Sequence, residues 1–348
     1  MLDKFKKILK SKEGFILKEN KDTCQKEKDR LIKVSGKIEK DLEKIKEFMN
    51  YPLSGDLMIR EFKVKIKDKE RKAFIFFIDG LVDRTNIGHF VLNPLMHESS
   101  EIKESGDAED FVYNRLISQN VLSKAKTYGE AIDKVCFGEC GIFIDGISVC
   151  FSADVKGWEK RGVGKPLTEG AILGPQESFT ELIRANTAML RKTIKDPELV
   201  MENIAVGKKS NTPCVLTYIK NLANDDLVSE IKKRMEKIDV DYLFTSDELA
   251  KFLEDSNYSL MPQILLTERP DRCALELVDG NVAVLVNGSP FALVMPATFF
   301  TFMKTTDNNY MRIPYANLLT VIRYLAMIVS VHFPALFIAV TNFHHEMI

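Results

Sequence analysis

Tryptophan, histidine and cysteine are scarce in this chain of 348 residues, which contains one, five and six of them respectively. A structural zinc site needs four converging ligands, but the closest cysteines, Cys136 and Cys140, have no second pair and no histidine near them. A catalytic set built on histidine would depend on His89 or His97, because the other three lie in or beside an apolar C-terminal segment. Neither is near a recognisable nucleophile motif. The sequence therefore indicates no metal, no cofactor and no complete catalytic set.

Several other signals are missing as well. Neither charge is in excess, since 49 Lys and Arg residues stand against 50 Asp and Glu residues, so nucleic acid is not expected as a partner. Gly164-Lys165 is followed by Pro166 rather than by the Ser or Thr of a phosphate-binding loop. The first residues, MLDKFKKILKSKEG, lack the apolar stretch of a secretory signal. We therefore expect most of the chain on the cytoplasmic side, with its cysteines reduced.

Charge is concentrated instead at the N-terminus, where residues 1–50 hold 15 Lys and Arg against 10 Asp and Glu. This composition predicts a charged, partly disordered tail. Ile38, Leu42, Ile45 and Met49 then recur at helical spacing. The short helix that they predict could dock on the following domain or, through its lysines, on a membrane surface.

Strand and helix patterns occur in the same order in the two halves of the chain. From Leu57, LMIREFKVKI and KAFIFFI predict two strands, residues 85–96, 109–122 and 127–136 predict helices, and GIFIDGISVCF predicts a hairpin at Asp145-Gly146. MENIAVGKKSNTPCVLTYI begins the second copy, and NVAVLVNGSPFALV ends it with a hairpin at Asn287-Gly288. We therefore predict an α/β protein with two similar α/β subdomains joined by a helical linker and followed by a C-terminal transmembrane helix. The predicted boundaries are 1–50 for the tail, 51–155 for the first subdomain, 156–200 for the linker, 201–296 for the second subdomain, 297–323 for a juxtamembrane segment and 324–343 for the transmembrane helix.

The linker contains GPQESFTELIRANTAMLRKTIKDPEL, whose apolar residues form one helical stripe that ends before Pro197. The remaining face carries charges of both signs. This helix is either a plain connector or a hinge or subunit contact. The residues expected to couple the two halves, or adjacent subunits, are Glu177, Glu181, Arg184, Asn186 and Arg191.

Two aspartates, Asp79 and Asp145, both occur in the sequence Ile-Asp-Gly. Paired carboxylates can perform acid–base chemistry. Aspartate before glycine is, however, the usual choice at a turn, because its side chain bonds nearby backbone N–H groups while glycine supplies a positive φ. We therefore interpret these positions as structural turn residues, namely Asp79, Gly80, Asp145, Gly146, Asn287 and Gly288.

Tyr324 to Phe343 is a run of twenty residues without charge. At about 1.5 Å per residue it covers roughly 30 Å, the thickness of the hydrocarbon core of a bilayer. Lys304, Arg312 and Arg323 precede the run, so the positive-inside rule predicts that the membrane is entered near Arg323 from the cytoplasmic side. Within the run, His332 is either a packed residue or a functional ionisable group, and Pro334 is expected to kink the helix.

Taken together, FIDGLVD, the linker, TERPD at 267–271, VNGSPFALVMPATFF and the C-terminal run resemble the A subunits of GerA-type spore germination receptors, from about Leu57 onward. The resemblance implies a subunit of a nutrient germinant receptor in the spore inner membrane, which relays germinant sensing to ion release. It also implies a transporter-like B subunit and a lipoprotein C subunit as partners, and a homo-oligomer of the intact protein. Members of that family continue through several more membrane helices, so the chain resembles a fragment or a truncated form. The alternative from another class is a membrane-anchored α/β enzyme acting in a cleft between the subdomains.

Overall fold

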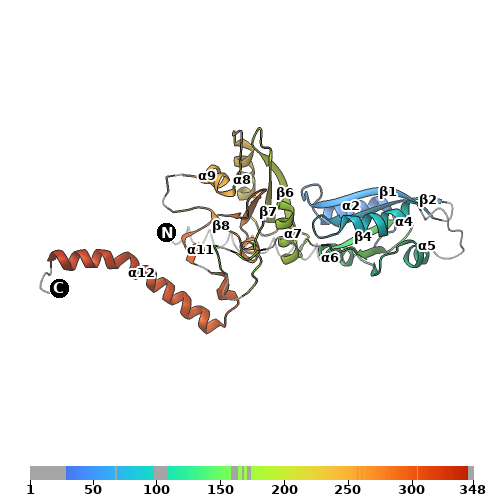
Figure 1. Ribbon diagram of the computed structural model, residues 1–348. Helices are drawn as coiled ribbons and strands as arrows, with labels where there is room; N and C mark the ends of the chain where they lie inside the picture. The colour runs from blue at the N-terminus through green and yellow to red at the C-terminus, as the bar shows by residue number, and fades with distance from the viewer. Residues whose placement is uncertain are drawn as a thin grey trace, which may run out of the picture.

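The computed structural model describes residues 29–66, 69–97, 108–157, 164–166, 168–170, 174–256, 258–259, 261–303 and 305–343. Within these ranges the chain forms two five-stranded sheets with helices packed on them, followed by a long C-terminal helix (Figure 1). The predicted α/β class, with two similar units and a C-terminal apolar helix, is confirmed. Residues 1–28 of the predicted N-terminal tail lie outside the described residues, and so does Lys304.

The first unit, called the first repeat, is built on one antiparallel sheet. Its strands are β1 (Leu57–Ile66), β2 (Lys69–Ile78), β3 (Leu122–Ala125), β4 (Glu139–Ile144) and β5 (Cys150–Asp154). Its helices are α2 (Ile38–Phe48), α3 (Arg84–Ile87), the π-helix η1 (Gly88–Leu92), α4 (Asn93–Met96), α5 (Ala108–Phe111), the π-helix η3 (Val112–Leu116) and α6 (Tyr128–Cys136).

The second repeat follows the same plan. Its strands are β6 (Leu199–Val206), β7 (Thr212–Ile219), β8 (Leu265–Thr267), β9 (Val282–Val286) and β10 (Ala292–Met295). Its helices are α7 (Ile183–Thr193), α8 (Asp225–Lys237), α9 (Ser246–Leu253) and α10 (Pro270–Val278). The strand orders, β1-β2-β4-β5-β3 and β6-β7-β9-β10-β8, are the same when each repeat is numbered from its own first strand.

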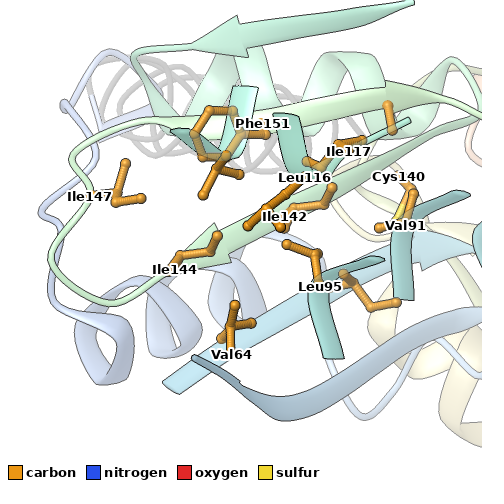
Figure 2. Packing of buried hydrophobic residues seen from close by; sticks show 14 of the residues in the cluster. Val64, Val91, Leu95, Leu116, Ile117, Cys140, Ile142, Ile144, Ile147 and Phe151 are labelled. Atoms are coloured by element: carbon orange, nitrogen blue, oxygen red, sulfur yellow. The ribbon is translucent and has the colours of Figure 1, made fainter. Parts of the chain in front are cut away.

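Each sheet is buried on both faces, and this explains the continuous apolar runs in its central strands. Phe74, Ile75 and Phe76 of β2 are all fully buried, as is every residue of β9. In the first repeat, α2 and α6 cover one face, and the helices between β2 and β3 cover the other. Figure 2 shows this second face, where apolar side chains from the strands and from η1, α4 and η3 point toward one another. Such a core, closed by helices on both sides, holds each repeat together mainly through apolar burial.

Both predicted hairpins are present, β4 with β5 and β9 with β10. Gly146 and Gly288 have φ of +80° and +89°, a region that favours glycine because it has no Cβ. The connections run from Asp145 to Val149 and from Asn287 to Phe291, longer than a two-residue turn.

Three features differ from the sequence-based expectations. The stretch 109–122 is helical only as far as Leu116, and it is followed by β3. Strand β8 was not expected either. Both are short edge strands, and their few residues give no clear alternating pattern. The expected linker helix is α7, which comes before β6 as α2 comes before β1, so it is also the first helix of the second repeat.

The C-terminal part consists of α11 (Phe299–Met303), the 3₁₀-helix η4 (Thr306–Asn309) and α12 (Ile313–Phe343). Helix α12 begins at Ile313, earlier than the expected start at Tyr324. By length and composition, Ile313–Asn342 could cross a membrane, with a mean hydropathy of 1.9 and none of its most apolar window buried. Figure 1 shows that α12 extends away from the repeats and bends part of the way along. Pro334 lies inside it, and proline is a common cause of such a bend.

Candidate coupling site between the two repeats

The hairpin turn of each repeat fixes the start of that repeat's first helix. Asp145 Oδ1 accepts a hydrogen bond from the backbone N–H of Ile38 at 3.3 Å, where α2 begins. Asn287 Oδ1 accepts from the backbone N–H of Ile183 at 3.3 Å, where α7 begins. The first N–H groups of a helix have no partner within the helix, so these side chains satisfy them. The Asp and Asn residues of the two turns therefore orient α2 and α7 in equivalent ways.

Helix α7 uses two faces. Met189 and Leu190 are buried in the core that α7, α10 and the second sheet share. On another face, Arg184, Ala188 and Arg191 recur at the spacing that aligns residues along a helix and contact the first repeat. The helix is thus a packed part of the second repeat and, at the same time, its contact surface toward the first.

A buried ion pair joins the two repeats. Arg191 Nε lies 2.7 Å from Asp56 Oδ2, and Arg191 Nη2 lies 2.9 Å from Asp56 Oδ1, so the pair is bidentate. Arg191 is 2% exposed and Asp56 is 5% exposed. Burial alone would lower the pKa of Arg191, but the adjacent Asp56 carboxylate raises it above its ordinary value. Arg191 is therefore charged at this joint, and each partner needs the other because neither has access to water.

A second carboxylate of the first repeat, Asp79, lies between two arginines. Arg84 Nε donates to Asp79 Oδ1 at 2.8 Å, and Arg184 of α7 forms an ion pair with Asp79 Oδ2. Asp79 is 4% exposed, whereas the Arg184 side chain is 50% exposed. The hydrogen bond to Asp79 raises the pKa of Arg84. Gly80 has φ of +92°, as its turn role requires, and a Cβ there would lie 3.2 Å from Ala188. The Asp79 carboxylate thus pairs with two arginines, a role that its sequence context, which is typical of a turn, does not indicate.

Backbone and polar contacts complete the junction. The N–H of Gly55 donates to the carbonyl of Met201 at 2.9 Å. Asn50 Nδ2 donates to the carbonyl of Pro197 at 3.4 Å, and Lys220 Nζ donates to Asn50 Oδ1 at 2.7 Å. These bonds join the segment before β1 to one end of the β6–β7 pair, where β6 begins and β7 ends. The junction therefore combines main-chain and side-chain contacts over several elements.

The remaining residues that the sequence singled out for coupling make contacts within the linker and the second repeat. Glu177 forms an exposed ion pair with Lys192 at 2.9 Å. The carbonyl of Glu181 accepts from the N–H of Gly288 at 2.8 Å. Asn186 is buried and its Oδ1 accepts from the N–H of Thr180 at 2.7 Å. In a single chain these three residues position α7, and Arg184 and Arg191 are the two that reach the first repeat.

Asp56, Arg84 and Asn50 were not identified from the sequence. Asp56 lies in the short stretch SGD before a strand, a composition typical of a turn. Its partner is Arg191, far along the chain, and no local pattern connects the two. Among the junction residues of the first repeat, the sequence singles out only Asp79 and Gly80, both as turn residues.

A chain of contacts continues from α7 to the C-terminal helices. Helix α10 packs against α7, and just before α10 Arg269 is 3% exposed. Arg269 Nη2 lies 2.7 Å from Asp271 Oδ2, and its Nη1 lies 3.4 Å from Asp307 Oδ1 in η4. Tyr310 donates its hydroxyl to Asp271 at 3.1 Å. The TERPD stretch thus connects the second repeat to the segment that leads into α12.

Within and before α12, the residues singled out from the sequence make local contacts. Arg323 Nη1 donates to the carbonyl of Met303, the last residue of α11, at 2.7 Å. His332 Nδ1 lies 2.8 Å from the carbonyl of Ile328, one turn earlier. Pro334 lies within the helix.

The described residues offer little for chemistry. They contain no group of three or more His, Cys, Asp or Glu side chains that could hold a metal ion. The five cysteines that they include are buried and unpaired with one another. Burial raises the pKa of the thiols of Cys136, Cys150 and Cys214 to about 12, so these thiols stay protonated at neutral pH. The site that stands out is the junction, where buried charges join two repeats.

Comparison with known proteins agrees with this architecture. The sequence model of the family described as Bacillus/Clostridium GerA spore germination protein matches residues 43–348. Spore germination protein KA of Bacillus subtilis (strain 168) is 31% identical over 324 residues, which is 93% of this chain and 59% of that protein. The membrane protein YfkQ of the same strain is 34% identical over 276 residues, 79% of this chain and 53% of YfkQ. This chain therefore spans little more than half the length of these relatives.

A solved structure shares the fold. The crystal structure of the N-terminal domain of the A subunit of the Bacillus megaterium spore germinant receptor GerK3 matches with a TM-score of 0.60 and 29% identity. The match covers 77% of this chain and 98% of that domain. With a family match over most of its length and relatives that are germination, sporulation or membrane proteins, the chain belongs to the GerA family of spore germination proteins.

Proposed function

We propose that this chain is the N-terminal part of a germinant receptor A subunit, and that the junction at α7 relays germinant sensing to ion release. The observation that carries the proposal is the buried Arg191–Asp56 pair, because it ties the first repeat to a helix that is itself part of the core of the second. Rigid elements with well-defined contacts are the physical means by which a change at one end of a molecule biases the other end. From α7 the path continues through α10 and Arg269 to Asp307 and then to α12.

The partners of this relay are a transporter-like B subunit, a lipoprotein C subunit and further copies of the same chain. The GerK3 domain belongs to an A subunit of a germinant receptor, which supports the assignment of this chain to that position. The location that we propose is the spore inner membrane, crossed by α12, with the repeats on the cytoplasmic or spore-core side. Arg312 immediately precedes α12, and Arg323 precedes its uncharged run, so both lie on the side of that run where the repeats are, as the positive-inside rule expects.

In this proposal the chain is not an enzyme. A cavity of about 380 Å³ does lie beside the junction, and it is lined by Asp133, Lys134, Phe137, Glu139 and Lys195. Among these described lining residues there is no histidine and no hydroxyl or thiol nucleophile. The ammonium groups of Lys156 and Lys195 each lie 4.2 Å from the ring centroid of Phe137, so part of this charge is engaged with an aromatic face. These lining residues therefore do not supply the nucleophile and the general base that an enzyme acting in this cleft would need.

The test of the relay is germination of spores that carry variants of the intact gene. Arg184→Ala removes a half-exposed ion pair to Asp79, so the protein should accumulate normally while the germination response slows or is lost. Arg234→Ala is the matched control, since Arg234 pairs with Glu230 and Asp255 within the second repeat. Normal germination in alanine variants at all five singled-out positions, Glu177, Glu181, Arg184, Asn186 and Arg191, would remove the proposal.

Orientation has its own test. A single cysteine at Lys208, whose side chain is 65% exposed, should remain unlabelled by a membrane-impermeant thiol reagent until the cells are lysed. A chain with its native cysteines alone is the control. Labelling in intact cells would place the repeats on the outer side of the membrane.

A further inference from the structure

An exposed aromatic surface lies between the second repeat and α12. Phe299, Phe300 and Phe302 of α11 are 43%, 60% and 39% exposed, and Tyr310 is 41% exposed. Large apolar side chains gathered in this way on a short segment need a partner that covers them. The repeats leave them uncovered, so the partner lies outside the described chain.

The position of α11 relative to α12 indicates what that partner is. The ring centroids of Phe300 and Tyr324 are 6.5 Å apart, and Tyr324 is the first residue of the uncharged run of twenty. Arg323 Nη1 holds the end of α11 through the carbonyl of Met303 at 2.7 Å. Helix α11 is therefore fixed beside the point at which the uncharged run begins.

The length of α12 supports the same placement. It has 31 residues, or about 46 Å at 1.5 Å per residue, which exceeds the roughly 30 Å of a hydrocarbon core. The uncharged run alone fills that core. Arg323 and the turns before it then lie at the headgroup level, and so does α11, which Arg323 holds.

The charge of the segment suits the same location. Residues 297–323 contain Lys304, Arg312 and Arg323 but a single acidic residue, Asp307. Asp307 is engaged by Arg269. Aromatic and basic side chains are enriched where protein meets anionic headgroups.

We propose that the aromatic face of α11 inserts at the headgroup–acyl boundary of the bilayer that α12 enters, so that the second repeat is held against the lipid surface. Arg323 sets the depth of α11 by joining its C-terminal carbonyl to α12. This membrane contact rests on the proposed insertion of α12 but not on the proposed relay, and its test uses no germination readout.

The experiment uses tryptophan fluorescence of the whole 348-residue chain in lipid nanodiscs. The only native tryptophan, Trp158, is replaced by phenylalanine. Single tryptophans then replace Phe300, Val331 in the middle of α12, or Phe252 in α9, which is 42% exposed and serves as the matched control. Lipids brominated near the headgroup or near the chain end act as quenchers of known depth.

We expect the emission of Phe300→Trp to be blue-shifted and to be quenched mainly by the lipid brominated near the headgroup. Val331→Trp should be quenched mainly by the lipid brominated near the chain end. Phe252→Trp should be quenched by neither lipid. If Phe300→Trp does not fold, as judged by circular dichroism, Phe302→Trp takes its place. A water-like, unquenched tryptophan at α11 beside a quenched Val331→Trp would overturn the proposal. A blue-shifted tryptophan that neither lipid quenches would show that protein covers the face, and an unquenched Val331→Trp would show that α12 is not inserted; either result also overturns it.

Discussion

Replacing the two partners of the Arg191–Asp56 pair, singly and together, should reveal how far this buried contact stabilises the junction. Arg191→Met leaves the Asp56 carboxylate, which is 5% exposed, without its bidentate partner. Asp56→Leu likewise leaves the buried guanidinium of Arg191 without its carboxylate partner. Breaking a buried pair by removing one partner costs about 3–5 kcal/mol, because the remaining charge is desolvated and unpaired. We therefore expect each single variant to lose about that much free energy of unfolding.

The double variant should behave differently. With both charges gone no desolvated charge remains, and replacing a buried pair by apolar side chains of similar volume is often neutral or stabilising. Arg191→Met with Asp56→Leu should therefore recover most of the loss. The size of the recovery measures the interaction between the two residues.

The assay is urea unfolding of the whole chain in a mild detergent, with free energies obtained by linear extrapolation. Arg184→Met is the matched control, because it removes the same kind of group from the same helix, but from a side chain that is 50% exposed. Exposed pairs contribute about 0–1 kcal/mol, so this control should differ little from the unchanged protein. A loss below about 1 kcal/mol for Arg191→Met, or a double variant no more stable than the singles, would refute the reasoning.

Three smaller predictions concern the hairpins and the thiols. Asn287→Ala removes the acceptor at the start of α7 and should cost about 0.5–2 kcal/mol in the same unfolding assay, as loss of a helix cap does. Gly288→Ala forces a Cβ into φ of +89° and should cost roughly 1–2 kcal/mol; no loss in either variant would contradict the capping geometry. Because burial raises the pKa of Cys136, Cys150 and Cys214 from 9.0 to about 12, their contribution to stability is fully present below pH 9 and is lost as the pH rises toward 12. A thiol reagent at pH 8 should label them only after unfolding, and rapid labelling of the folded chain would contradict their burial.

Those parts of the fold that depend on neighbouring residues could be predicted from the sequence. Asp145-Gly146 and Asn287-Gly288 carry the conformational requirement of a turn in two adjacent residues, and the apolar stripe of α7 follows from its spacing. The equal order of elements in the two halves then indicated the duplication.

The pairing of residues across the junction could not be predicted in the same way. Asp56 and Arg191 are far apart in sequence, and each is ordinary in its local context: one precedes a strand and the other lies near the end of a helix. Their pairing depends on how two separately folded sheets meet. The edge strands β3 and β8 escaped detection for a related reason, since their few residues become strands by pairing with β5 and β10 rather than through their own pattern.

The duplicated fold explains why the junction joins unlike repeats. The N–H of Asp79 donates to residue 56 at 2.8 Å as the N–H of Lys220 donates to residue 198 at 3.0 Å, so Asp79 and Lys220 hold equivalent positions with opposite charge. The second residue of each repeat's first helix also changes the sign of its charge, from Glu39 in α2 to Arg184 in α7. Asp79 therefore attracts α7 but would repel α2 at that position, and Lys220 would repel the arginine that α7 presents. The two repeats share a fold, and these charges favour contact between unlike repeats, because contact between two first repeats or two second repeats would bring like charges together.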